Sequence, residues 1–134
     1  MTTPVAILGA GGHAKVVIDI VERMNAHRIA GVFDDDRSKW GTQVLGHPVL
    51  GGIDDFLLNW RSRCPEAVMG IGNNHVRQAL YRRLREAAFR PTTAIHPTAA
   101  VAREVELGEG TVVMAMAAVN PGCRIGPGAG CRFG

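Results

Sequence analysis

The stretch of sequence that decides the fold covers residues 95–134 and, divided into sixes, reads IHPTAA-VAREVE-LGEGTV-VMAMAA-VNPGCR-IGPGAG-CRFG. An aliphatic residue opens every complete group: Ile95, Val101, Leu107, Val113, Val119 and Ile125, with Cys131 in the next place. A smaller residue follows four positions after each: Ala99, Val105, Thr111, Ala117, Cys123 and Ala129. A helix has no period of six, and strand alternation does not produce graded sizes at fixed positions. The period therefore predicts a left-handed parallel β-helix, in which each hexapeptide forms one side of a three-sided coil.

The predicted β-helix is short, because three hexapeptides make one coil and residues 95–134 supply only about two coils. Repeat folds bury their core by stacking, and the last coil exposes unpaired backbone groups. We therefore expect further chain, a partner or neighbouring subunits to cover that edge. We expect Cys123 and Cys131 to pack in the core or at the corners of the coils rather than to act as nucleophiles or ligands, because both follow the six-residue register. The alternative interpretation is a glycine-rich, poorly ordered tail.

The residues before this stretch alternate between strand and helix patterns. Residues 5–8 and 28–33 are short apolar runs typical of buried parallel strands, and residues 66–71 form a third. Apolar residues spaced by three and four between positions 14 and 21 indicate a helix. A second helix follows the third strand, with Asn74 as its expected N-cap and with Val76, Leu80 and Leu84 on its apolar side. This alternation predicts a parallel sheet with right-handed crossovers.

The whole chain is thus expected to have an α/β fold with two parts. The first part, residues 1–94, is predicted to be a small Rossmann-like domain. The second part, residues 95–134, is predicted to be the first coils of the β-helix.

A glycine-rich turn lies between the first strand and the first helix. It fits the pattern G-x-G-x-x-G/A with the residues Gly9, Gly11, Gly12, His13 and Ala14. Glycines let the backbone approach a phosphate, and a helix N-terminus offers N–H groups and a positive dipole end. These five residues are therefore candidates for binding a nucleotide or a nucleotide sugar. The alternative is a tight strand-to-helix turn without a ligand.

Polar residues follow two further strands at the same edge of the predicted sheet. Asp34 and Asp35 come after the second strand, where a carboxylate can accept hydrogen bonds from a ribose or a base. Gly72 and Asn73 come after the third strand, and ligands in open α/β sheets bind outside the carboxyl ends of the strands. The aspartates could instead form a solvated turn, and Asn73 could be a helix cap. A nicotinamide dehydrogenase is disfavoured, because nothing in the sequence supplies a second catalytic domain.

Composition limits the possible partners and compartments. The net charge of +3 is too small to indicate nucleic acid or a membrane as a partner. The arginines between Arg77 and Arg90 are interpreted as the wet face of a helix. Three cysteines without a CxxC pair favour reduced thiols, so we expect a soluble, unexported, cytoplasmic protein. No metal-ligand spacing occurs, and we expect no metal site. His96 precedes Pro97 at the entry to the repeats and is interpreted as a structural turn.

Taken together, these stretches resemble the NeuD/PglD family of sialic acid O-acetyltransferases and nucleotide-sugar N-acetyltransferases. The resemblance is carried by ILGAGGHAKV at residues 7–16, FDD at residues 33–35, GIGN at residues 70–73, and IHP at residues 95–97 leading into hexapeptides. It implies that the glycine turn with His13, the Asp34–Asp35 pair and the Gly72–Asn73 turn line a nucleotide-sugar site. It also implies acetyl-CoA as the acetyl donor and a homotrimer.

The resemblance further implies a general-base histidine in a later β-helix coil, beyond residue 134. We therefore expect no catalytic residue in this chain and no activity from it alone. The predicted function is acetyl transfer from acetyl-CoA to a nucleotide-linked amino sugar or to sialic acid, with N- and O-transfer both open. The alternatives are a nucleotide-sugar binding module without catalysis and a structural role through the open end of the β-helix.

Overall fold

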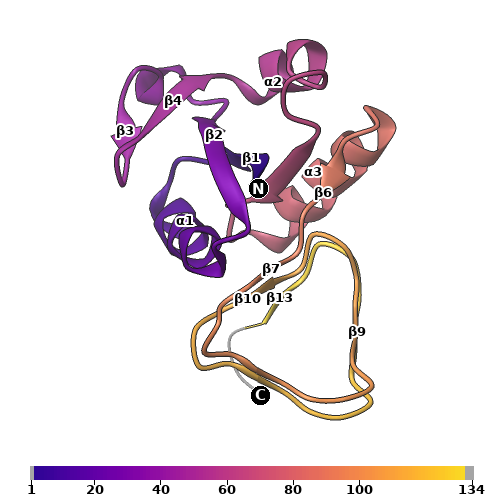
Figure 1. Cartoon of the computed structure of the whole chain (residues 1–134). Coiled ribbons are helices and arrows are strands. Elements are labelled where there is room, and N and C mark those ends of the chain that lie inside the picture. Colours follow the sequence, from indigo (N-terminus) through magenta and orange to yellow (C-terminus); the bar gives the residue numbers. More distant parts are fainter. Residues whose placement is uncertain (1, 132–134) are drawn as a thin grey trace.

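The computed structural model describes residues 2–131, without the side chain of Cys131. The expected packing of Cys131 and the last three positions of the expected second part, residues 132–134, lie outside the described residues. The chain forms an open sheet covered by three helices, with triangular coils below it (Figure 1).

The first part contains a six-stranded sheet with the order β3-β4-β2-β1-β5-β6. All its pairs are parallel except β3 with β4, as the alternating pattern predicted. Its elements are β1 (Thr3–Leu8), α1 (Gly12–Met24), β2 (His27–Phe33), the 3-10 turn η1 (Arg37–Lys39), β3 (Gln43–Val44), β4 (His47–Gly51), α2 (Ile53–Asn59), β5 (Glu66–Met69), α3 (Asn74–Glu86) and β6 (Arg90–Pro91).

Different helices cover the two faces of the sheet, and this explains why residues 5–8 of β1 are all apolar. Val5 and Ile7 point to the face covered by α1, whereas Ala6 and Leu8 pack on the face covered by α2 and α3. All four side chains are fully buried. Because both of its faces are buried, β1 lies at the centre of the core.

The second part is a parallel β-helix. Its strands are β7 (Ala94–Ile95), β8 (Ala100–Val101), β9 (Glu106–Leu107), β10 (Val112–Val113), β11 (Ala118–Val119), β12 (Arg124–Ile125) and β13 (Gly130–Cys131). Val112 pairs with both Ala94 and Gly130, so one coil spans eighteen residues. β8 pairs with β11 and β9 with β12 on the other two sides. The six-residue period is therefore confirmed as three-sided coils.

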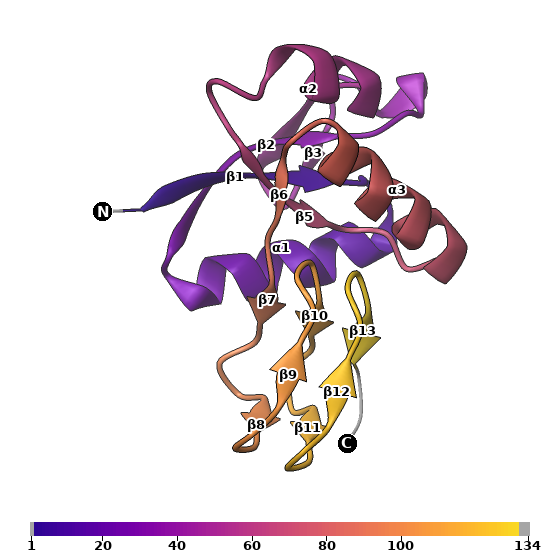
Figure 2. The ribbon, with the colours of Figure 1, turned by 90° about the vertical axis from the view of Figure 1, so that its right-hand side faces the viewer.

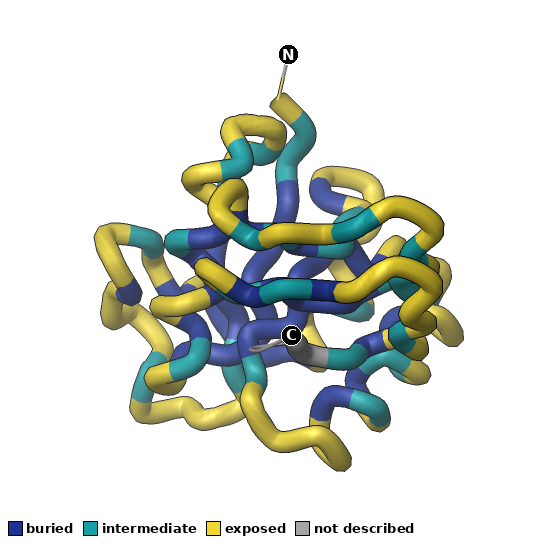
Figure 3. The backbone as a smooth tube through the Cα atoms, turned by 90° about the horizontal axis from the view of Figure 1, so that it is seen from below, coloured by how far each residue is buried: buried dark blue, intermediate teal, exposed yellow. Residues whose placement is uncertain are grey.

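The interior of the coils holds the side chains that the period singled out. Val113, Ala117 and Val119 are buried together, and Ile95 and Leu107 pack against them. Exposed stretches of the coils are interrupted by buried and half-buried positions, and residues 107–114 are all buried or half-buried (Figure 3). Cys123 is exposed, so the expectation that it packs is wrong.

The β-helix is docked against the first part at two places. α1 lies between the sheet and the coils, and Ala94 and Val112 share its apolar cluster (Figure 2). On the other side, the Tyr81 hydroxyl of α3 donates to Glu109 Oε1 at 3.0 Å, and Arg85 Nη1 lies 3.1 Å from the same oxygen. The two parts therefore share contacts on both sides of the junction.

Candidate functional site

Gly9 is required by the fold. Its φ of +115° lies in a region that side chains disfavour, and an added Cβ would lie 2.7 Å from Gly70 O and 2.8 Å from Ile71 Cγ1. Its own N–H donates to Phe33 O at 2.7 Å. Gly9 thus brings the ends of β1, β2 and β5 together, where the candidate site lies.

Gly11 and Gly12 differ from Gly9, because the fold does not require them to be glycine. Gly11 has an ordinary φ of −85° and is the N-cap of α1, and Gly12 is the first residue of that helix. Both are exposed, and a Cβ added at either would meet no atom of residues 2–131 within 4 Å. Within the described chain, no side chain caps α1. The start of α1 is therefore open to an anionic ligand, as in dinucleotide-binding folds.

His13 and Ala14 follow in the first turn of α1. A Cβ on Gly72 would lie 3.7 Å from His13 Cγ, so the structure brings the predicted His13 and Gly72 side by side. Ala14 is fully buried, and its Cα lies 3.4 Å from where a Cβ on Gly70 would be. Ala14 therefore supports the site through close packing of helix on strand.

Asp34 holds the glycine turn in place. Its Oδ2 accepts the Ala10 N–H at 2.7 Å, and its Oδ1 accepts the Asp36 N–H at 2.7 Å. The Trp40 indole N–H donates to the Asp34 carbonyl at 2.7 Å. Both carboxylate oxygens thus bind backbone N–H groups, so Asp34 organises two loops at once.

Asp35 is more exposed than Asp34 and less engaged. Its Oδ1 accepts the Ile53 N–H at 3.2 Å, which caps the start of α2. Next to it, hydrogen bonds from the Ser38 side chain and backbone lower the pKa of Asp36. The aspartate turn is therefore not simply solvated: all three carboxylates accept backbone N–H groups.

Asn73, rather than Asn74, is the N-cap of α3. Its side chain accepts the Val76 N–H at 3.0 Å, so the expected cap was placed one residue too late. Of the two alternatives for Asn73, the structure shows the cap. Gly72 and Asn73 are both exposed at the sheet edge that carries the glycine turn.

A cleft of about 270 Å³ opens beside these turns. Its lining residues are Gly9, Asp34, Asp35, Ile53, Ile71, Val76, Ala79, Leu80 and Arg83. The structure thus unites Gly9 with the aspartate pair, whereas the other predicted residues lie outside this cleft. Its walls are largely aliphatic, which favours a flat, weakly polar group over a phosphate.

Sequence reasoning missed the far wall of the cleft. Val76 was placed by its spacing among the buried residues of α3, but it is 48% exposed at the cleft. Arg83 was assigned to the wet face of the helix, although it lines the cleft and pairs with Asp54 of α2. An apolar residue in the exposed first turn of a helix is the one signal that could have indicated this wall.

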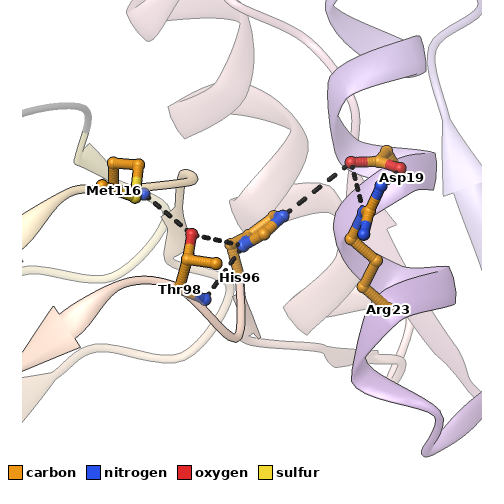
Figure 4. Close-up of polar contacts among 5 residues, drawn as sticks. All are labelled: Asp19, Arg23, His96, Thr98 and Met116. Atoms are coloured by element: carbon orange, nitrogen blue, oxygen red, sulfur yellow. Dashed lines mark hydrogen bonds and ion pairs between the residues drawn. The ribbon is translucent and has the colours of Figure 1, made fainter.

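His96 lies outside this region, at the junction of α1 and the first coil (Figure 4). The Thr98 N–H donates to its Nδ1 at 3.0 Å, which leaves the proton of the neutral ring on Nε2, 3.9 Å from Asp19 Oδ2. Thr98 Oγ1 accepts the Met116 N–H of the next coil at 3.0 Å. The interpretation of His96 as a structural turn is confirmed.

Metal-ligand clusters and membrane-spanning helices are both absent from residues 2–131. Residues 2–131 contain no cluster of three or more His, Cys, Asp or Glu side chains that could hold a metal ion. In the same part of the chain, no helix has both the length and the apolar character needed to cross a membrane.

Comparison with known families identifies this arrangement. Residues 4–84, which contain the sheet and the cleft, match the PglD N-terminal domain. The chain belongs to the PglD family. The resemblance drawn from the sequence is thereby confirmed, and PglD-family relatives also extend the match into the β-helix.

The related proteins are acetyltransferases. UDP-N-acetylbacillosamine N-acetyltransferase of Bacillus subtilis is 36% identical over 113 residues, which are 83% of this chain and 51% of the relative. PerB of Caulobacter crescentus, solved with CoA and GDP-perosamine, is 36% identical with a TM-score of 0.88, covering 100% of this chain and 62% of PerB. The acetyltransferase domain of PglB from Neisseria gonorrhoeae is 31% identical with a TM-score of 0.82, covering 96% of this chain and 62% of that domain. The chain thus spans about half the length of its curated relative.

Proposed function

We propose that this PglD-family chain supplies the nucleotide-sugar site of an N-acetyltransferase that uses acetyl-CoA. In this proposal the diphosphate lies at the start of α1, against Gly11, Gly12 and His13. The ribose and base extend past Asp35 into the cleft, and the sugar lies near Gly72 and Asn73. The PglD-family relatives support an amine as the acetyl acceptor, because both named sugar substrates belong to N-acetyltransferases.

The observation that carries the proposal is the contrast between the glycines. A side chain at position 9 would be strained by its backbone angle and its contacts, whereas Gly11 and Gly12 have ordinary backbone angles or open space around them. Gly12 is the first helical residue of α1, and glycine at a helical position lowers stability by up to about 1 kcal/mol relative to alanine. A glycine there, at a helix start that no side chain of the described residues caps, is explained by a ligand that approaches the backbone closely.

The reaction has a simple balance. The amine nitrogen attacks the thioester carbonyl, a carbon–nitrogen bond forms, and the carbon–sulfur bond breaks. The amine loses a proton and CoA leaves as the thiol. The described residues would contribute by holding the nucleotide end of the acceptor, which fixes the amine relative to the acetyl donor.

The proposal is tested with Gly12→Ala. The added methyl group enters open space, so the free energy of unfolding should stay equal or rise by up to about 1 kcal/mol. Calorimetric affinity for UDP or GDP should fall tenfold or more, because the methyl group occupies the phosphate position. Equal affinity in the variant and the parent would refute phosphate binding at this turn. Transfer itself is measured as thiol release that requires both acetyl-CoA and a nucleotide-linked amino sugar.

We also propose a cytoplasmic homotrimer without nucleic-acid or membrane partners. The side of the coils that carries β8 and β11 supports self-association, because Met116 is 81% exposed and Val101 is 36% exposed there. Light scattering should give three times the chain mass, and Met116→Glu should lower that value. The cytoplasm is where acetyl-CoA and nucleotide sugars are both available.

A further inference from the structure

The proposed nucleotide site ends in a cleft whose size and walls suit a single base. At about 270 Å³ it lies just below the usual range for sites of drug-sized ligands, so it does not hold a whole nucleotide sugar. Ile53 comes from the start of α2, Ile71 follows β5, and Val76 and Leu80 come from α3. Aliphatic side chains from three elements therefore surround the space, as expected for a site that receives the flat face of a ring.

A series of contacts leads from the glycine turn, where the proposed phosphates lie, to Arg83. Ala10 in the glycine turn binds Asp34, the neighbouring Asp35 binds Ile53, and Asp54 after it pairs with Arg83. Arg83 also follows Asn74 by nine residues, which is about 13 Å along the axis of α3. A nucleotide with its phosphates at the start of α1 thus points the outer edge of its base towards Arg83.

We propose that Arg83 selects the base, favouring uracil, thymine and guanine over cytosine and adenine. This inference rests on the proposed function. A guanidinium group only donates hydrogen bonds. At the edge farthest from the ribose, uracil, thymine and guanine carry a carbonyl oxygen, which accepts a hydrogen bond. Cytosine and adenine carry an amino group at the same position, which would face Arg83 donor to donor.

The pairing of Arg83 with Asp54 supports this role. Arg83 is 39% exposed and Asp54 is 80% exposed, so the pair itself adds little to stability. The pair does place the guanidinium group beside the cleft, between α2 and α3. An arginine side chain that is held before the ligand arrives loses less conformational freedom on binding.

The test compares four probes that differ only in the base: UDP, GDP, CDP and ADP. Their dissociation constants are measured by calorimetry on the chain, on Arg83→Met and on Arg82→Met. UDP and GDP should bind at least about fivefold more tightly than CDP and ADP, because a mismatched donor pair costs at least that much. Arg83→Met should bring the ratio close to one by weakening UDP and GDP. Arg82→Met is the matched control, because Arg82 is exposed and does not line the cleft.

Each outcome separates the inference from the proposed function. If none of the four probes binds, the proposed nucleotide site itself fails. If all four bind equally to the parent chain, nucleotide binding stands and selection by Arg83 is overturned. If Arg83→Met weakens all four equally, Arg83 contacts the phosphates or the ribose and the inference is again overturned. Arg83→Gln guards against a folding artefact, because an amide both donates and accepts and should lower the ratio while UDP still binds.

Discussion

Replacing Asp34 should reveal that this residue acts through the backbone of the glycine turn. Its two carboxylate oxygens accept N–H groups from Ala10 and Asp36 at 2.7 Å each. Hydrogen bonds to a charged group contribute about 1.5–3 kcal/mol each, and an unpaired buried N–H costs about 1–3 kcal/mol. Loss of the partly buried hydrogen bond from Ala10 should cost its whole stabilisation energy, whereas water can replace the exposed hydrogen bond from Asp36. Asp34→Ala should therefore lower the free energy of unfolding by about 3 kcal/mol.

Urea denaturation followed by circular dichroism measures this loss as a lower transition midpoint with an unchanged slope. Asp34→Asn keeps one acceptor oxygen and should lose about half as much. The matched control is Asp35→Asn, because Asp35 is exposed and its one backbone contact, to Ile53, is longer at 3.2 Å. The control should change stability by less than about 1 kcal/mol and should weaken UDP binding. An Asp34→Ala protein as stable as the parent would refute the proposed role.

Three further predictions concern the glycine turn, the junction of α3 with the coils, and the interior of the coils. Gly9→Ala should cost about 2 kcal/mol or more in urea denaturation, because of its positive φ and the contact with Gly70 O; a loss below 0.5 kcal/mol would contradict this. Tyr81 is the chain's one tyrosine. Its pKa is raised above 10.0, mainly by burial of the phenol and also by its hydrogen bond to Glu109. Ultraviolet titration should show this, and Glu109→Gln should lower the midpoint. Since the raised pKa favours the neutral phenol in the fold, its contribution is present below about pH 10 and is lost as the pH rises through the folded pKa. Val113→Ala should cost about 2 kcal/mol, because the side chain is fully buried inside the coils, and an unchanged midpoint would argue against a packed interior.

The sequence predicted those parts of the fold that depend on local period. The six-residue period indicates the coils whatever the coils pack against, because each hexapeptide forms one side of a coil. The apolar run of β1 was equally informative, since a strand buried on both faces needs no other signal. The caps were less predictable: Asn73 and Asn74 are chemically identical, and only the backbone direction decides which one accepts the Val76 N–H.

The cleft could be predicted only in part, because its two walls have different origins. Gly9 and the aspartates sit at the ends of strands, and parallel topology brings strand ends together whatever the details. Val76 and Arg83 lie on the same side of α3 as Leu80, as their spacing requires, and all three line the cleft. Spacing alone does not show that this side meets an open cleft at Val76 and Arg83, because that depends on how α2 and the strand ends lie opposite it.

Helix α3 is the element that relates the cleft to the coils. One side of it presents Val76 and Arg83 to the cleft, and another carries Tyr81 and Arg85 to Glu109 of the β-helix. A helix is rigid over this length, so a shift of Glu109 relative to the sheet must either break these contacts or carry Arg83 with it. The proposed position of the base and the position of the coils are thus linked by one helix. In the proposed acetyltransferase, the distance between the nucleotide and an acetyl donor on the coils would then depend on Tyr81, Arg83 and Arg85 of α3 and on Glu109 of the β-helix.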